Sequence, residues 1–180
     1  MIEIDTEKIN RINFRNCLDA MSHPGNIYSV TSLFDSGLLA VASVLLYSEV
    51  TYHYQGALNF QVVAALTGAK RSSIECADYL FSDRPDRLAL QKAKAGTAES
   101  PEDSAILLFQ CNDLTTGTQV ILSGPGIDGS FITRLPMQAD FIEQFQEKNS
   151  NFPNGVDLFL IDMANRIVGL PRTVHIEVIP

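Results

Sequence analysis

The chain has 180 residues, of which 46% are hydrophobic and 19% charged, as is usual for one globular domain. A formal net charge of −8 argues against nucleic acid as a partner, because phosphate backbones are bound by clustered Lys and Arg. The longest apolar stretch, 38–46, is far shorter than the roughly 20 residues that span a bilayer, and the N-terminus lacks a secretory signal pattern. We therefore expect one cytoplasmic domain over residues 1–180 that contacts neither nucleic acid nor membrane.

The first half of the chain is predicted to alternate helices and strands. Asp5 or Thr6 can cap the first helix, and Pro24 with Gly25 stops it. Helical spacing predicts one apolar stripe on that helix, formed by Phe14, Cys17, Leu18 and Met21. Further helices are expected over 37–46, 59–67 and 83–95, and strands over 50–55 and 77–81.

The second half is predicted to be richer in strands. Strands are expected over 105–110, 119–122 and 130–133, and a helix around 141–145. The run 156–161 is almost entirely apolar, which predicts a central strand, whereas 173–179 alternates and predicts an edge or half-exposed strand. Interleaved helices and strands of both kinds predict a layered α/β domain with a mixed sheet.

The sequence contains no self-sufficient catalytic motif. Cys17, Cys76 and Cys111 are widely spaced in apolar runs, which predicts reduced core thiols and no zinc or disulfide framework. No G-x-S-x-G elbow and no phosphate-binding loop of known pattern is present. None of the five lysines has the enclosed apolar setting that a Schiff base with pyridoxal phosphate requires. We therefore expect no cofactor and no metal.

A histidine and two glycines are candidate ligand contacts. His23 directly precedes Pro24, in a loop whose conformation the proline restricts. Gly124 and Gly126 follow a predicted strand, where successive backbone N–H groups can bind an anion. A tight turn explains the same two glycines and is the favoured alternative.

Two arginines complete the set of candidate ligand contacts. Arg15 lies beside the apolar stripe of the first helix, with pairing to Asp19 as the alternative role. Arg172 follows a proline, which restricts the loop and prepares the guanidinium to bind a carboxylate or phosphate through two hydrogen bonds. An internal ion pair to Asp157 or Asp162 explains Arg172 equally well.

Short motifs along almost the whole chain occur in the order of a known family. They are Phe14-Arg15, Ala20 to Gly25, Gly96-Thr97, Pro101-Glu102, Ser123 to Ile127, Asn151 to Asp157 and Leu170 to Thr173. In this order the chain resembles PhnH, the H subunit of the bacterial carbon–phosphorus lyase system for phosphonate breakdown. It departs from the family pattern at Leu46-Tyr47-Ser48-Glu49, where relatives tend to have Leu-Leu-Asp.

The resemblance implies a three-layer α/β fold similar to the large domain of pyridoxal phosphate-dependent transferases, without the cofactor lysine. It also implies a homodimer and a core complex with the G, I and J subunits. With the G, I and L subunits, the family is associated with synthesis of ribose 1-methylphosphonate 5-triphosphate from ATP and methylphosphonate.

These implications favour a scaffolding subunit that also holds ATP or a phosphonate through Arg15, His23, Gly124, Gly126 and Arg172. One alternative is a stand-alone enzyme or binding protein for a small phosphorylated or phosphonate ligand. Another is a subunit that serves in oligomerisation alone.

Overall fold

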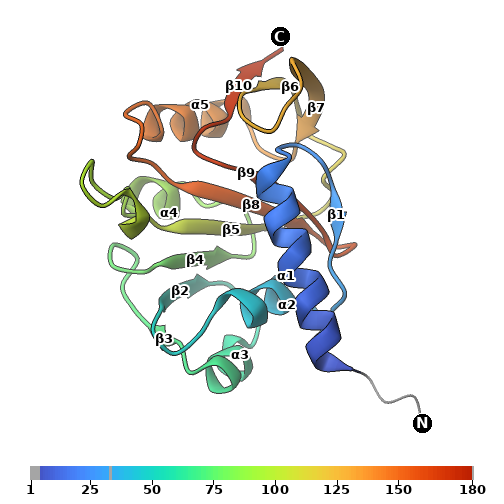
Figure 1. Ribbon diagram of the computed structural model, residues 1–180, viewed down its shortest axis with the longest axis vertical. Helices are drawn as coiled ribbons and strands as arrows, with labels where there is room; N and C mark the ends of the chain where they lie inside the picture. Colours follow the sequence, from blue (N-terminus) through green and yellow to red (C-terminus); the bar gives the residue numbers. More distant parts are fainter. Residues whose placement is uncertain (1–4, 33, 180) are drawn as a thin grey trace.

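Two sheets of unequal size organise the chain (Figure 1). The computed structural model describes residues 5–32 and 34–179, so residue 33 and the expected domain ends, 1–4 and 180, lie outside this description. The larger sheet contains, in spatial order, β1 (Tyr28–Ser29), β9 (Arg166–Leu170), β8 (Asp157–Asp162), β5 (Ile106–Cys111), β4 (Tyr79–Ser82), β2 (Thr51–Gln55) and β3 (Lys70–Arg71). The smaller sheet contains β10 (His175–Val178), β6 (Thr118–Ser123) and β7 (Ser130–Leu135).

The larger sheet is mixed, as the sequence predicts. Strands β3, β2, β4, β5 and β8 run parallel, and β9 runs antiparallel to both of its neighbours, β8 and β1. The apolar run 156–161 forms most of β8, which lies between β5 and β9, so its predicted central position is confirmed. The alternating segment forms β10, an edge strand of the smaller sheet, as predicted.

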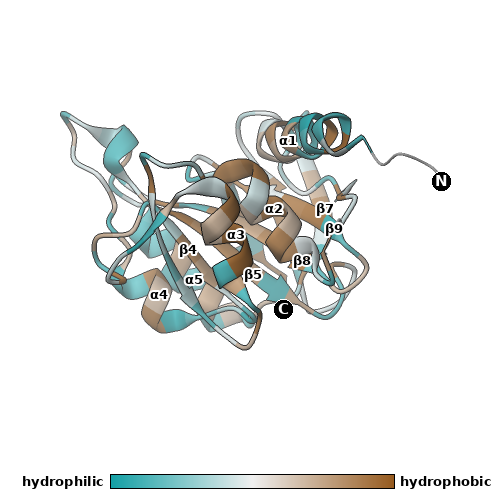
Figure 2. Cartoon of the chain, turned by 90° about the horizontal axis from the view of Figure 1, so that it is seen from below, coloured by the Kyte–Doolittle hydropathy of each residue, from teal (hydrophilic) through white to brown (hydrophobic). Residues whose placement is uncertain are grey.

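Helices cover both faces of the larger sheet. On one face lie α1 (Thr6–Ser22), α2 (Gly37–Leu45) and α3 (Phe60–Thr67). On the other lie α4 (Arg87–Lys92), α5 (Ala139–Lys148) and the smaller sheet. Figure 2 shows α1, α2 and α3 on one side of the strands of the larger sheet and α4 and α5 on the other. The result is a layered α/β arrangement, with a 3-10 turn at Pro101–Asp103.

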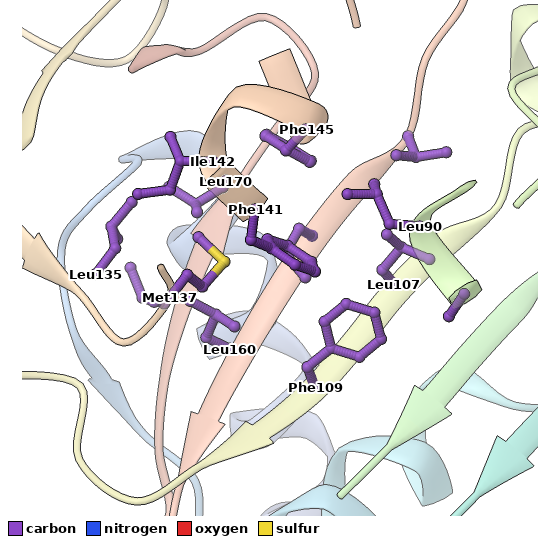
Figure 3. Close-up of a cluster of buried hydrophobic side chains, with 14 of the residues drawn as sticks. Leu90, Leu107, Phe109, Leu135, Met137, Phe141, Ile142, Phe145, Leu160 and Leu170 are labelled. Atoms are coloured by element: carbon purple, nitrogen blue, oxygen red, sulfur yellow. The ribbon is translucent and has the colours of Figure 1, made fainter. Parts of the chain in front are cut away.

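The core on the α5 side joins the two sheets. Phe109 of β5 meets Phe141 of α5 edge to face, with ring centroids 6.1 Å apart (Figure 3). Leu90 from α4 and Leu135 from β7 are buried in the same cluster. Burial of each such side chain contributes about 1.5–3 kcal/mol, so this layer stabilises the attachment of the smaller sheet.

Lys148 adds a polar link between α5 and α4. Its Nζ donates to the backbone carbonyls of Gln91 and Ala93, at 2.9 and 2.6 Å. These carbonyls belong to the end of α4, where acceptors lack partners within the helix. Burial lowers the pKa of Lys148. Lys148 is therefore partly desolvated, although its neighbours in the sequence are mostly polar.

The predicted apolar stripe on α1 is wrong at two positions. Phe14 and Leu18 are 45% and 53% exposed, whereas Asn13, Cys17 and Ala20 are buried. Two of these three side chains are small, and the third is polar. Of the predicted stripe, Phe14 and Leu18 therefore turn toward solvent, whereas Cys17 is buried and Met21 partly buried.

The reason for this orientation is a close approach between α1 and β9. A Cβ atom on Gly169 of β9 would lie 2.6 Å from the carbonyl oxygen of Ala20, so only small residues fit on both sides. Asn13 is satisfied by two hydrogen bonds with the backbone of Thr31, at 2.8 and 2.9 Å. The buried amide of Asn13 therefore has a hydrogen-bond partner for its nitrogen and one for its oxygen.

Several elements differ from the sequence-based expectation. Strands β1, β3 and β9 were not predicted, and the helix expected over 83–95 is confined to Arg87–Lys92. The separate three-stranded sheet was also unexpected. Cys76 is exposed, which corrects its assignment to the core. Within residues 5–32 and 34–179, no helix combines the length and apolar character needed to cross a membrane.

The three thiols should differ sharply in reactivity toward a maleimide or iodoacetamide at pH 8. Cys76 is exposed, whereas burial raises the pKa of Cys17 and of Cys111 to about 12 and keeps both thiols protonated. Mass spectrometry of the native protein should show modification at Cys76 first. Rapid labelling of either buried thiol without denaturant would contradict the packing described.

Candidate functional site

The turn between β6 and β7 is wedged between two other motif loops. A Cβ atom on Gly126 would lie 2.1 Å from the carbonyl oxygen of Ser22, at the end of α1. A Cβ atom on Gly124 would lie 2.9 Å from the carbonyl oxygen of Thr173, on the other side of the turn. Both glycines have positive φ, of +84° and +125°. Close packing and backbone conformation therefore both require glycine at these positions.

His23 is the last residue of the α1 end that faces this turn. Its backbone N–H donates to the carbonyl of Asp19 at 2.9 Å and caps the helix. Its Nδ1 lies 3.1 Å from the same carbonyl and 3.4 Å from the hydroxyl of Tyr28. The imidazole is exposed, and one of its two nitrogens already has partners in the chain.

Arg172 is bound on all sides by other motif loops. Its Nε and Nη2 contact the two carboxylate oxygens of Asp157, at 3.3 and 2.8 Å. Its Nη1 donates to the carbonyls of Pro101 and Pro153, at 3.1 and 3.2 Å. Its Nη2 also donates to the hydroxyl of Ser104. The five N–H groups of a guanidinium are thus all used within the chain.

Of the two alternatives for Arg172, the structure contains the internal ion pair with Asp157. The side chains of Arg172 and Asp157 are 13% and 22% exposed, so the pair is largely screened from water. Asp157 also accepts a hydrogen bond from the backbone N–H of Arg172, at 2.8 Å. For Arg172 to bind an anion, it would have to give up existing hydrogen bonds.

Arg15 lies apart from the other four candidates. It is exposed on α1, seven residues before Ser22, which corresponds to about 10 Å along a helix. Among the described residues it forms no ion pair, so the alternative pairing with Asp19 is not formed. The structure therefore brings the loops of His23, Gly124, Gly126 and Arg172 together and leaves Arg15 outside the group.

A groove of about 620 Å³ lies beside the Arg172 loop. Its lining residues are Pro125, Gln146, Asn149, Ser150, Phe152, Arg172, Thr173, Val174 and His175. The amides of Gln146 and Asn149 are bonded to the backbone of Ile176, Val174 and Val156, at 2.7–3.2 Å. Together with Arg172, these are three of the six polar side chains of the groove, and all three are already bonded within the fold.

A second cleft, of about 490 Å³, opens where β4 and β5 end. It contains Asp83, Arg84, Asn112 and Asp113, which the sequence-based reasoning missed. A signal for them existed, because each pair directly follows a buried parallel strand, and ligand sites of α/β sheets lie at carboxyl ends of strands. Within the described ranges, no three His, Cys, Asp or Glu side chains are grouped so that they could hold a metal ion.

Comparison with known proteins identifies the family. The family described as "Bacterial phosphonate metabolism protein (PhnH)" matches residues 5–177 of this chain. The chain belongs to the PhnH family. A relative from Stutzerimonas stutzeri, named "Putative C-P lyase subunit protein HtxG", is 30% identical over 166 residues. The match covers 91% of this chain and 84% of that relative, and the PhnH membership indicated by the order of the motifs is confirmed.

The fit of the β6–β7 turn in this PhnH protein can be tested with two glycines of one hairpin. Gly126→Ala should lower the free energy of unfolding by about 3 kcal/mol or more, through a clash and a positive φ together. Gly129 also has positive φ, at +70°, but a Cβ atom there would meet nothing within 4 Å. Gly129→Ala should therefore cost only about 1–2 kcal/mol in urea unfolding, and equal costs would contradict the wedged turn.

The Arg172 cluster predicts a strict requirement for guanidinium. Arg172→Lys keeps the charge but cannot make the same five hydrogen bonds, so it should lower the free energy of unfolding by about 2–4 kcal/mol. Arg15→Lys, at an exposed position, should change it by less than about 0.5 kcal/mol. Equal stability of the Arg172→Lys variant and the wild type would show that the cluster is dispensable.

Proposed function

We propose that this PhnH family protein is a subunit of a carbon–phosphorus lyase and contributes by assembly, without bond-breaking chemistry of its own. The observation that carries this proposal is that residues of the family motifs contact one another within the chain. The guanidinium of Arg172 and the glycines of the β6–β7 turn bind or pack against other motif loops. The printed name of the Stutzerimonas stutzeri relative, a putative lyase subunit, supports the same role.

The proposal extends to the partners and the step. The partners are the G, I, J and L subunits, and the step is formation of ribose 1-methylphosphonate 5-triphosphate from ATP and methylphosphonate. A homodimer, a cytoplasmic location and a fold like the large domain of pyridoxal phosphate-dependent transferases belong to the same proposal. Ligand contact by Arg15, His23, Gly124, Gly126 and Arg172 stays a prediction.

The outer face of α1 is the surface we propose for subunit contact. Phe14 and Leu18 are one helical turn apart and about half exposed. Arg11 and Arg15 are exposed on the same helix and flank them. Large apolar side chains surrounded by charged ones are typical of subunit interfaces, in which an apolar centre is enclosed by a polar rim.

Assembly is tested by co-expression of the chain with the other four lyase subunits from the same source. The tagged chain should copurify with them, and omission of the chain should abolish formation of the triphosphate product from ATP and methylphosphonate. Full product formation without the chain, or turnover by the purified chain alone, would contradict the proposed function.

The same experiment tests the docking face. Phe14→Glu combined with Leu18→Glu should preserve the thermal melt but abolish copurification, because both side chains project largely into solvent in the isolated chain. Leu66→Glu, at a residue of α3 that is 68% exposed, is the matched control and should leave assembly intact. If the double variant assembles normally, the interface lies elsewhere.

A further inference from the structure

The connections of the larger sheet reverse direction between β2 and β4. After β2 the chain crosses through α3 to β3, and after β4 it crosses through α4 to β5, toward the opposite edge. Phe60 of α3 and Leu90 of α4 belong to the cores on opposite faces of the sheet. Reversals of this kind leave a crevice at the carboxyl ends of the two strands involved, and a separate cleft lies one strand further along, at the ends of β4 and β5.

Asp83 holds the two strand ends together at this reversal. Its Oδ1 accepts from the hydroxyl of Tyr54 on β2, and its Oδ2 accepts from the backbone N–H of Ala57, both at 2.7 Å. A Cβ atom on Gly56 would lie 2.3 Å from this carboxylate, so the backbone approaches it closely. The wall of the neighbouring cleft is therefore fixed by hydrogen bonds.

The cleft of about 490 Å³ beside Asp83 has the size of a small-molecule site. Its walls come from the ends of β4 and β5, from the loop that enters β6 and from the segment after β7. The lining residues are Asp83, Arg84, Pro85, Gln110, Cys111, Asn112, Asp113, Thr116, Gly117, Thr118, Pro136, Met137 and Gln138.

Arg84 offers this cleft a positive charge. It is exposed, and among the described residues its guanidinium takes part in no ion pair or hydrogen bond. The neighbouring arginines are occupied, because Arg87 pairs with Asp140 and Arg166 pairs with Asp113 and Asp162. A guanidinium at a fixed cleft is suited to a phosphate group, which it can bind through two hydrogen bonds.

Asp113 offers the same cleft an acceptor for hydroxyl groups. Within the described part of the chain, its side chain accepts through Oδ1, from the N–H and hydroxyl of Thr115 and from Arg166, at 2.7–2.9 Å. The hydrogen bond from the Thr115 N–H, followed by those from its hydroxyl and from Arg166, lowers the pKa of Asp113. The carboxylate is therefore ionised at neutral pH, and its Oδ2 remains for a ligand.

The other walls match the same ligand chemistry. Asn112, Thr116 and Gln138 provide amide and hydroxyl groups, which bind sugar hydroxyls. Cys111 is buried, and burial, with the nearby Asp162 and Asp113 carboxylates, raises its pKa to about 12. A thiol in that state is a poor nucleophile, so the cleft has the character of a binding site rather than a thiol-based reaction site.

We propose that this cleft binds a phosphorylated pentose, as a sugar phosphate or as part of a nucleotide, with Arg84 at the phosphate and Asp113 at the hydroxyls. The choice of a pentose among phosphorylated polyols rests on the proposed function, in which ATP supplies the ribose. The size of the cleft, the Arg84 guanidinium and the acceptor groups do not depend on that choice.

Isothermal titration calorimetry on the full chain tests the site with four probes: ribose 5-phosphate, AMP, ribose and inorganic phosphate. Ribose 5-phosphate should bind more tightly than ribose or phosphate alone, and comparison with AMP distinguishes the sugar phosphate from the nucleotide. Arg84→Gln should weaken binding of the tighter ligand about tenfold or more, as expected on losing a charge-assisted contact.

Two variants complete the test. Arg84→Lys keeps the charge and should recover most of the affinity, whereas Lys8→Gln, which removes an exposed positive charge on distant α1, should match the wild type. The site is wrong if neither ribose 5-phosphate nor AMP binds saturably. It is also wrong if Arg84→Gln weakens binding less than about fivefold, which corresponds to about 1 kcal/mol.

The assembly experiment separates this inference from the proposed function. Arg84→Gln should still copurify with the lyase subunits, because the Arg84 side chain makes no contact that the fold needs among the described residues. Absent ligand binding with intact wild-type assembly rejects the cleft alone. Absent wild-type assembly rejects the proposed function, whatever the cleft binds.

Discussion

The relation between the two sheets depends on the ion pair between Arg172 and Asp157. Asp157 begins β8 of the larger sheet, and Arg172 lies in 171–174, the short segment that leads from β9 into β10. A largely buried guanidinium is tolerated only when its donors are satisfied. By satisfying them, Asp157 and the surrounding carbonyls fix the point at which the chain leaves one sheet and enters the other.

This constraint explains why the motif loops resemble a ligand site in sequence. Arginine after proline and paired glycines after a strand are suited to anion binding, but the same residues are suited to tight packing of loops. In this chain the glycines face the backbone of α1 and of the Arg172 loop, and the guanidinium binds carbonyls. The motifs therefore describe how the layers are joined, and the open polar cleft lies elsewhere, at the carboxyl ends of β4 and β5.

Much of the fold could be predicted because local pattern and burial agree for several elements. Strands β8 and β10 have unbroken and alternating hydrophobicity that match their central and edge positions. The face that α1 buries could not be predicted, because the close approach at Gly169 sets it. Gly169 lies 147 positions beyond Ser22, the last residue of α1. Strand β9 was missed because Gly169 interrupts an already short apolar run, and glycine is unfavourable in strands.

The candidate site could be predicted less well, because it depends on pairs that are distant in sequence. Ser104 and Pro101 contact Arg172 across 68 and 71 positions, and no local pattern connects them. The cleft likewise requires the strand order, since only the adjacency of β4 and β5 brings Arg84 near Asp113.

The β6–β7 hairpin has one constrained side and one open side. Gly124 and Gly126 pack against backbone atoms of other loops. Gly129, three residues after Gly126, has no atom within 4 Å of the position a Cβ would take. Additional residues at that tip would extend into solvent and leave both sheets undisturbed. The tip is therefore a suitable place to attach a fluorophore or an affinity peptide while the motif loops keep their contacts.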